Sequence, residues 1–306
     1  MVSENAQGAW ATEGVKATAA RGEALDSVTA SLSVLREAVS AARTVTAKLI
    51  GRRGRRGHER VAREYDGSIW KRVVDERRWE KVASLHDYVV PQDSRPRLAK
   101  IDGRIVRIST SDYYEFRLAK LQELIALRTI EGEGIIELGC GWGLNLFSLA
   151  LTRRWKSLRG FDISSNGVAA TNQAAAHFGI TSVHARQLDL TARNDPAFGE
   201  MRGTTVFTYL CLEQLKYSTA AIIENLLAAN IRRAIHIEPV PEVLRWWRLG
   251  DAANKLYIAG NDYQDNLLST LRSFERSGRL RVLEVSRLSF APRPVYDPTL
   301  ICWESA

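Results

Sequence analysis

The chain has few cysteines and no long apolar run. Cys140, Cys211 and Cys302 are the only cysteines among 306 residues, and their scatter argues against a disulfide framework. No cluster of histidine, cysteine and aspartate has the spacing of a metal site, so we expect no bound metal. No stretch of 18 apolar residues occurs, and residues 1–10 lack the basic-then-apolar order of a signal peptide. We therefore expect a soluble, cytoplasmic protein with reduced cysteines and no membrane contact.

The composition is that of an ordinary globular protein, with 45% hydrophobic and 25% charged residues. Such a length allows one large core and an accessory region. The net charge of +8 is uneven, because residues 1–110 hold 21 Lys and Arg against 14 Asp and Glu. This basic excess could attract nucleic acid, an acidic protein segment or a phosphorylated substrate, and it is equally compatible with a solvated basic linker.

Two features of the N-terminal part indicate a helix followed by a hinge. Apolar residues recur there at alternating spacings of three and four: Leu25, Val28, Leu32, Leu35, Val39, Ala42 and Leu49. This heptad-like stripe predicts a helix that joins two copies as a homodimer or docks on its own chain. The run at 51–57 contains three glycines and four arginines, which favours an exposed hinge. We place the first boundary there, after residue 57.

Residues 58–110 form the predicted accessory segment. Helical periodicity over 58–90 ends in a Pro-containing stretch, and residues 98–108 indicate two short strands joined by a tight turn at Asp102-Gly103. Thr110 or Ser111 is the expected cap of the next helix, at 112–127.

The most informative motif follows that helix. A short apolar strand leads into Glu137, Gly139, Gly141 and Gly143, and an apolar helical pattern starts at Leu144. Glycines let the backbone turn sharply and approach a ligand, while the helix start directs free N–H groups at it. A dinucleotide fingerprint needs a glycine where Leu144 stands, so a nicotinamide dinucleotide is not the expected ligand.

The pattern E-x-G-x-G-x-G resembles motif I of the class I S-adenosylmethionine-dependent methyltransferases, and the resemblance extends from about residue 111 to the C-terminus. A second strand, 158–163, contains Asp162 at the family's ribose-binding acid, and a third, 183–188, ends before Asp189 at the adenine position. The implied fold is α/β, a doubly wound, mostly parallel seven-stranded sheet with an antiparallel C-terminal hairpin, here preceded by an N-terminal helical extension. Further strands are expected at 204–210, 234–237, 280–290 and 299–303.

The resemblance implies S-adenosyl-L-methionine as cofactor and a methyltransferase domain at 111–306. The cofactor-binding residues that it implies are Glu137, Gly139, Cys140, Gly141, Gly143, Asn145, Asp162, Ile163, Asp189 and Leu190. Arg117, in the helix before motif I, is a candidate for the cofactor carboxylate, and Tyr113 is a candidate for the substrate. Aromatic packing beneath the sheet with a surface arginine is an equal alternative.

The loops after the fourth and fifth strands are expected beside the transferable methyl group. Glu213 and Glu238 are therefore the candidate catalytic residues, with Tyr209, because an amine or guanidine acceptor must lose a proton. Alternatively, Glu213 caps a helix or pairs with Lys216, and Glu238 holds backbone amides of its own loop. In that case a sugar or polyketide O-methyltransferase is the better interpretation.

Trp246 and Tyr263 could wall the acceptor pocket, although tryptophans at this place also serve to pack a crossover helix. The sequence thus predicts methyl transfer to a small metabolite or modified peptide, as in natural-product tailoring. The alternative of another class is a catalytically inactive, methyltransferase-like binding module. A nucleic acid acceptor is disfavoured, because residues 111–306 are almost neutral and lack the Asn/Asp-Pro-Pro-aromatic tetrad of base methyltransferases.

Overall fold

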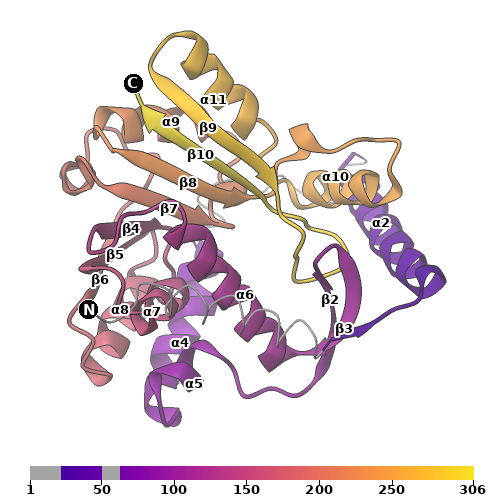
Figure 1. Cartoon of the computed structure of the whole chain (residues 1–306), viewed down its shortest axis with the longest axis horizontal. Coiled ribbons are helices and arrows are strands. Elements are labelled where there is room, and N and C mark those ends of the chain that lie inside the picture. Colours follow the sequence, from indigo (N-terminus) through magenta and orange to yellow (C-terminus); the bar gives the residue numbers. More distant parts are fainter. Residues whose placement is uncertain (1–21, 50–62) are drawn as a thin grey trace, which may run out of the picture.

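The computed structural model describes residues 22–49 and 63–306. A seven-stranded sheet in the order β6-β5-β4-β7-β8-β10-β9 forms its centre (Figure 1). Its strands are β4 (Gly134–Leu138), β5 (Ser157–Asp162), β6 (Val183–Gln187), β7 (Thr205–Tyr209), β8 (Arg233–Glu238), β9 (Leu280–Arg287) and β10 (Thr299–Ser305). All neighbours are parallel except β10, which is antiparallel to both β8 and β9. This α/β architecture, a mostly parallel seven-stranded sheet with an antiparallel C-terminal hairpin, confirms the predicted fold class.

Helices cover both faces of this sheet, so β4 is buried on both sides. Its successive residues Ile135 and Ile136 belong to different hydrophobic cores, as the alternation of side chains along a strand requires. Ile135 packs in a core with Leu121 and Phe147, and Ile136 packs in a core with Ile222. The covering helices are α6 (Thr110–Ala126), α7 (Leu144–Leu151), α8 (Ser165–His177), α9 (Thr219–Ala228) and α11 (Leu267–Arg276). Helix α10 (Leu249–Asn261) packs in smaller hydrophobic clusters apart from these two cores. Short 3-10 turns are η3 (Pro196–Met201), η4 (Leu212–Gln214) and η5 (Pro241–Val243).

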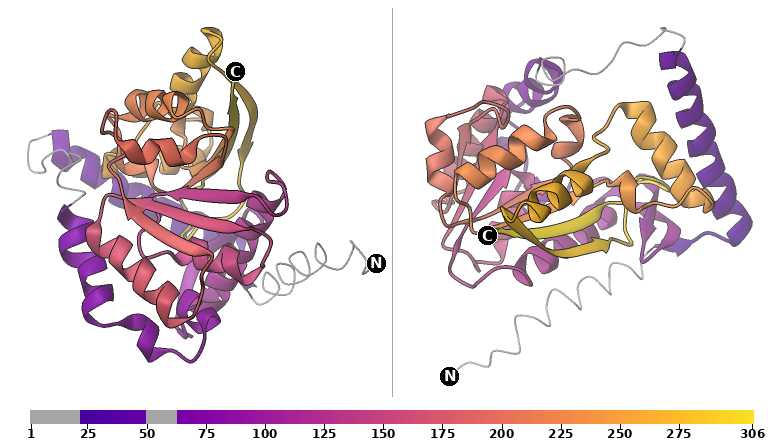
Figure 2. Two further views of the ribbon diagram at one scale, coloured as in Figure 1. Left: turned by 90° about the vertical axis from the view of Figure 1, so that its left-hand side faces the viewer. Right: turned by 90° about the horizontal axis from the view of Figure 1, so that it is seen from above.

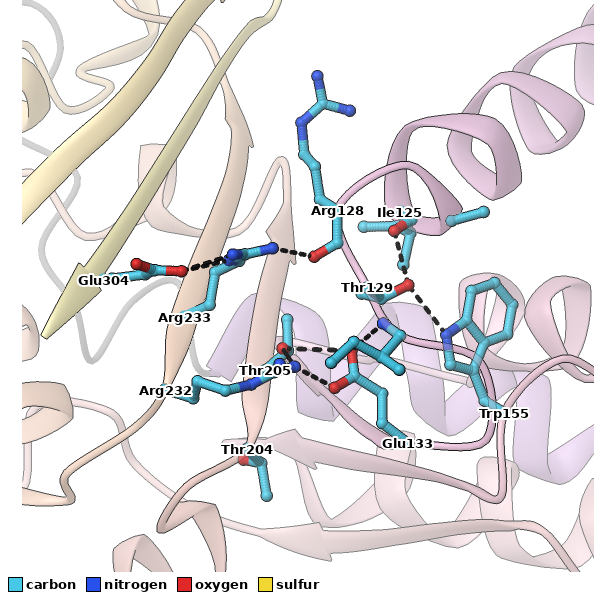
Figure 3. A network of polar contacts seen from close by, with 12 residues as sticks. Ile125, Arg128, Thr129, Glu133, Trp155, Thr204, Thr205, Arg232, Arg233 and Glu304 are labelled. Atoms are coloured by element: carbon cyan, nitrogen blue, oxygen red, sulfur yellow. Dashed lines mark hydrogen bonds and ion pairs between the residues drawn. The ribbon is translucent and has the colours of Figure 1, made fainter.

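A polar network fixes the amino ends of the central strands (Figure 3). Glu133, just before β4, accepts hydrogen bonds from Arg232 and from Thr205, and Arg232 Nη2 lies 2.7 Å from Thr205 Oγ1. Arg233 Nε donates to Glu304 of β10 at 3.1 Å. Since these groups satisfy one another, this end of the sheet is closed, and the carboxyl ends of the strands are left to form a site.

The predicted hairpin is confirmed as β2 (Pro96–Ile101) and β3 (Arg104–Ser109), to which β1 (Glu23–Ala24) adds a third strand. Asp102 and Gly103 have φ of 48° and 77°, as a tight hairpin turn requires. The cap of α6 is Ser109, whose Oγ accepts from the amide of Asp112 at 3.0 Å, so the predicted cap at Thr110 or Ser111 was wrong. The hairpin itself ends at the capping residue, with no loop between strand and helix.

In the predicted helical segment 58–90, the described residues 63–75 form one helical run that contains the π-helix η1 (Tyr65–Trp70) and α4 (Lys71–Asp75), and the shorter helices η2 (Arg78–Lys81) and α5 (Leu85–Val89) follow. Arg77 adopts a left-handed φ of 43°, which breaks the run before η2. Trp79 and Tyr88 are buried in the same core as Phe147. This segment is therefore packed on the sheet domain, while the predicted hinge at 51–57 lies outside the described residues.

Helix α2 (Ser27–Leu49) lies beside α10, as Figures 1 and 2 show. It docks through Val34, Ala38 and Ala41, none of which belongs to the predicted stripe, and Leu25 of the stripe packs against the same cluster. The stripe residues Val28, Leu32, Leu35 and Val39 are exposed. Docking by the heptad stripe was thus the wrong choice of face, and a homodimer through it stays a prediction. Across the ranges 22–49 and 63–306, no helix is both long enough and apolar enough to span a membrane.

Candidate functional site

A cavity of about 530 Å³ opens beside the glycine loop, at the carboxyl ends of the parallel strands. Its wall combines residues that follow β4, β5, β6 and β7 with side chains of η1, β2 and α6. The volume falls within the range of about 300–1,000 Å³ that is typical of small-molecule sites. In open α/β sheets, ligands bind at this end, where the strand order reverses, and here β4 lies between β5 and β7.

The glycines of the loop are required by the backbone and its neighbours. Gly139, Gly141 and Gly143 have φ of 79°, 53° and 81°. A Cβ on Gly139 would lie 2.2 Å from Cys211 Sγ, and one on Gly141 would lie 2.8 Å from Trp70 Cζ2. Gly139 and Gly141 line the cavity, whereas Gly143 packs behind it and begins α7. The loop therefore presents its backbone to the cavity, and neighbouring side chains lie in close contact with the glycines.

Two aspartates, Asp162 and Asp189, line the cavity. Asp162 accepts from the amide of Gly141 at 2.7 Å through Oδ2 and from that of Ser164 at 2.8 Å through Oδ1. Burial raises the pKa of Asp162. Asp189 accepts from the amide of Thr191 at 2.8 Å. Each carboxylate oxygen has lone pairs beyond these bonds, so both residues can still accept hydrogen bonds from a ligand's hydroxyl or amino groups.

A buried arginine occupies another part of the wall. Arg117 Nη2 donates to Asn145 Oδ1 at 2.6 Å, and Asn145 Nδ2 donates to Glu137 Oε1 at 2.6 Å. The guanidinium carbon lies 4.3 Å from the centre of the Tyr209 ring. Arg117 Nη1 is buried and has no hydrogen-bond partner. An unpaired cationic donor in a cavity wall is suited to a ligand carboxylate.

Glu137 lies behind this wall and is fully buried. Burial raises its pKa to about 8. Since its oxygen accepts from the Asn145 amide, it turns the amide oxygen of Asn145 toward Arg117. Glu137 is thus placed to position Arg117 through Asn145, and it does not line the cavity itself.

The structure gathers most of the predicted site residues in one wall. The cavity is lined by Tyr113, Arg117, Gly139, Cys140, Gly141, Asn145, Asp162, Ile163, Asp189, Leu190 and Tyr209. Glu137 and Gly143 lie directly behind it. Ligand contacts at these positions stay predictions. Arg117 and Tyr113 are both buried, which differs from the alternative of a surface arginine.

Glu238 is not in the wall. Its Oε1 accepts from the amides of Cys211 and Leu212 at 3.0 and 3.1 Å, and its Oε2 accepts from that of Glu213 at 3.3 Å. Burial raises its pKa to about 7. The carboxylate therefore holds the loop after β7, which agrees with the structural alternative, although the amides belong to the neighbouring loop and not to its own.

Glu213 and Tyr263 share a buried cluster outside the wall. Glu213 Oε1 accepts from Gln214 Nε2 at 2.6 Å, and its Oε2 accepts from the hydroxyl of Tyr296. The Tyr263 ring centre lies 6.2 Å from that of Tyr257 and 5.9 Å from that of Tyr296. Neither Glu213 nor Tyr263 reaches the cavity surface. The predicted contacts of Glu213 and Tyr263 with the acceptor would require these buried side chains to move from the positions described.

Several further residues lie around the site but outside the cavity wall. Trp246 is 62% exposed, outside the cavity, with Lys255 Nζ lying 5.3 Å from its ring centre. Lys216 pairs with Asp265 at 2.9 Å, so it does not serve Glu213. His236 is a core residue, and burial lowers its pKa to about 3. No group of three potential metal ligands occurs in the part of the chain that the structure describes.

Sequence reasoning missed three cavity-lining residues from outside the sheet domain, Tyr65, Trp70 and Arg97, and it missed Pro292 in the loop before β10. Asp66 holds η1 beside the glycine loop, because its Oδ1 accepts from Ser164 Oγ at 2.7 Å and from the Asn166 amide at 3.0 Å. The aromatic residues at helical spacing were a usable signal for η1. Nothing in the sequence singled out Arg97.

No protein-family model matches the chain, and no curated protein matches it. Among solved structures, it is similar to magnesium protoporphyrin IX methyltransferase from Synechocystis PCC 6803 with bound S-adenosylhomocysteine, at 18% identity over 64% of this chain and 87% of that one, with a TM-score of 0.47. Geranyl diphosphate C-methyltransferase from Streptomyces coelicolor A3(2) matches at 14% identity over 63% and 80%, with a TM-score of 0.47.

A third match is a putative RNA methyltransferase from Pyrococcus horikoshii, at 12% identity over 63% of this chain and 86% of that one, with a TM-score of 0.43. The names of these three proteins give very different substrates: magnesium protoporphyrin IX, geranyl diphosphate and RNA. The assignment of the fold to this chain rests on its own strand order and pairing.

Proposed function

We propose that the chain is an S-adenosylmethionine-dependent methyltransferase that acts on a small molecule or a modified peptide. The observation that carries this proposal is the buried, unpaired Nη1 of Arg117 in the same cavity as Asp162 and Asp189. An amino acid joined to a nucleoside has a carboxylate for the arginine and hydroxyl and amino groups for the two acids. A dinucleotide has no such carboxylate.

The residues present fit this cofactor. Asp162 would accept from the ribose hydroxyls, Asp189 from the adenine amino group, and Arg117 would bind the carboxylate. Ile163 and Leu190 supply an apolar wall for the base. When bound, the cofactor supplies an electrophilic methyl group on a sulfonium. The chain's task is to hold the acceptor in line with that methyl group and to exclude water, for which Tyr65, Trp70 and Trp142 cover the cavity.

The cavity favours transfer to oxygen over transfer to an amine. The predicted amine or guanidine acceptor depended on Glu213 and Glu238, and both carboxylates are engaged outside the wall. In the described wall, the only carboxylates are Asp162 and Asp189, and no histidine lines it. An acceptor that arrives as a carboxylate or phenolate needs no base: its oxygen forms the O–CH₃ bond as the C–S bond breaks, and the electron pair goes to sulfur.

The direct test is methyl transfer itself. The enzyme and cofactor with an isotopically labelled methyl group are incubated with extract from the organism that makes the protein, and labelled products are identified by mass spectrometry. At a cofactor concentration below saturation, we expect a labelled small molecule or peptide with wild type and much less label with Arg117→Met, which keeps an apolar side chain against Tyr209. If S-adenosylhomocysteine binds but no label is transferred, the binding-module alternative replaces the enzyme.

A further inference from the structure

The geometry around Arg97 points to the acceptor's chemical class. We propose that the acceptor carries an oxyanion, either a carboxylate or a phosphate, which Arg97 and Tyr113 hold in the cavity. The role of this ligand as methyl acceptor rests on the proposed function. The binding of an oxyanion is independent of that function, because it follows from the side chains that line the cavity.

Arg97 is a cation without a carboxylate partner in the described residues. It lies on β2, and its Nη2 donates to the carbonyl of Pro292. Its guanidinium carbon lies 4.7 Å from the centre of the Tyr113 ring, and its Nε is buried without a hydrogen-bond partner. These contacts hold the guanidinium in place through a neutral carbonyl and an aromatic face, so its positive charge is not compensated.

Comparable cations elsewhere in the fold are compensated. Arg128 pairs with Glu284 at 2.8 Å, and Lys100, on the same strand as Arg97, pairs with Asp297 at 2.6 Å. A charge that is partly withdrawn from water without a counter-ion costs free energy, unless a ligand supplies the counter-ion. Arg97 differs from these residues in lining the cavity.

Tyr113 provides the second donor. It is 2% exposed, it lines the same cavity, and its hydroxyl has no hydrogen-bond partner. Burial raises the pKa of this hydroxyl, so it stays protonated and can only gain by donating to a ligand oxygen. A guanidinium and a phenolic hydroxyl on one wall favour an anion with at least two oxygens.

The surroundings of Arg97 are also basic. A groove lined by Arg36, Arg97, Pro292 and Arg293 shares Arg97 and Pro292 with the cavity, and Glu37 is its only acidic residue. Glu37 lies 4.0 Å from Arg293 and partly compensates it. The groove therefore extends the positive potential outward from Arg97, which attracts an acid and repels a cationic amine.

In this proposal Arg117 binds the cofactor and Arg97 binds the acceptor. Arg117 is tied to the glycine-loop helix α7 through Asn145, where the cofactor carboxylate is expected. Arg97 is tied to the loop before β10 through Pro292, on the accessory side of the cavity. Two arginines on different elements thus allow the cofactor and the acceptor each to bring one anion.

The test uses four small probes of similar size: benzoate, phenyl phosphate, benzamide and benzylamine. Their affinities for the full-length protein are measured by ligand-observed NMR, with and without saturating S-adenosylhomocysteine. We expect benzoate or phenyl phosphate to bind at least about tenfold more tightly than neutral benzamide and cationic benzylamine, and the stronger of the two anions identifies the oxyanion. With saturating S-adenosylhomocysteine occupying Arg117, Arg97→Gln should abolish this preference, and Tyr113→Phe should reduce it severalfold.

Arg107→Gln is the matched control, because Arg107 is an exposed arginine on β3 of the same sheet and does not line the cavity. It should leave the preference unchanged. Equal affinity for all four probes, or an unchanged preference in Arg97→Gln, would overturn the proposal. So would a fall in S-adenosylhomocysteine affinity in Arg97→Gln as large as in Arg117→Met. Failure of wild type to bind S-adenosylhomocysteine would contradict the proposed function instead, since the anion preference is also scored without it.

Discussion

Arg117 and Asn145 are joined by a 2.6 Å hydrogen bond from Nη2 to Oδ1, and both side chains are buried in the cavity wall. Asn145 is itself fixed by Glu137, so the guanidinium is held before any ligand arrives. Its Nη1 is left free for a ligand. Preorganisation of this kind lowers the entropy cost of binding a carboxylate.

Arg117→Met should lower the affinity for S-adenosylhomocysteine by about 1.5–3 kcal/mol, the usual contribution of a hydrogen bond to a charged group. The same substitution should barely change the affinity for 5′-methylthioadenosine, which lacks the amino acid part. Calorimetry with both ligands separates the two effects. A matching loss for both would mean that the substitution disturbs the whole cavity and that the carboxylate contact is wrongly assigned.

Glu137 makes stability depend on pH. Its pKa of about 8 in the folded chain lies above the ordinary value of 4.5, because burial favours the neutral form. Between these pH values the folded state binds more protons than the unfolded state. The free energy of unfolding should therefore fall as pH rises, by up to about 1.4 kcal/mol per pH unit.

Thermal unfolding of the ligand-free protein between pH 6.5 and pH 8 measures this effect, because at lower pH the buried His236, whose pKa is lowered to about 3, adds a slope of the opposite sign. Glu137→Gln should flatten the decline, although Glu238, whose pKa is raised to about 7, adds a slope of the same sign. If wild type instead becomes more stable over this range, the buried carboxyls are ionised and the assigned direction is wrong.

Glu238→Gln should act on stability and not on chemistry. The amide nitrogen of glutamine cannot accept the loop's N–H groups, so we expect a loss of about 1–3 kcal/mol in the free energy of unfolding. Turnover per folded molecule should stay close to wild type. Denaturant unfolding and kinetics on the labelled acceptor check both parts. A drop of about 10²-fold in kcat/KM with unchanged stability would restore Glu238 as a general base.

The exposed stripe of α2 provides a test of assembly. If it joins two copies, Leu32→Glu with Leu35→Glu should convert a dimer into a monomer in light scattering, while cofactor affinity is retained. Both side chains are exposed, so the monomer itself should fold normally. Ser31→Glu with Arg36→Glu, also exposed on this helix, is the control for added charge. A dimer that persists in the stripe variant would place the interface elsewhere.

The sequence predicted the sheet domain well because its signals are local. Every expected strand from β4 to β10 exists, and Asp162 and Asp189 both reach the cavity, since each follows a strand whose carboxyl end faces it. The same rule failed for Glu213 and Glu238. Position after a strand fixes where a backbone goes, but the side chain of Glu238 turned to backbone amides, which no sequence pattern revealed.

The contribution of the accessory segment could not be predicted for another reason. Trp70 and Arg97 reach the cavity through contacts between residues far apart in the chain, such as Trp70 with Gly141 and Arg97 with Pro292. For α2, the periodicity showed a helix but not which face is covered. Ala38 and Ala41 are small enough for close approach to α10, and the larger residues of the stripe stayed outside.

The central claim is that this cavity binds an adenosyl amino acid. Titration calorimetry of S-adenosylhomocysteine into wild type and Asp162→Ala, with NAD as the comparison ligand, tests it most directly. We predict micromolar or tighter binding of S-adenosylhomocysteine to wild type, a loss of about 1.5–3 kcal/mol in Asp162→Ala, and no binding of NAD. Absence of S-adenosylhomocysteine binding, or an unchanged affinity in Asp162→Ala, would contradict the account.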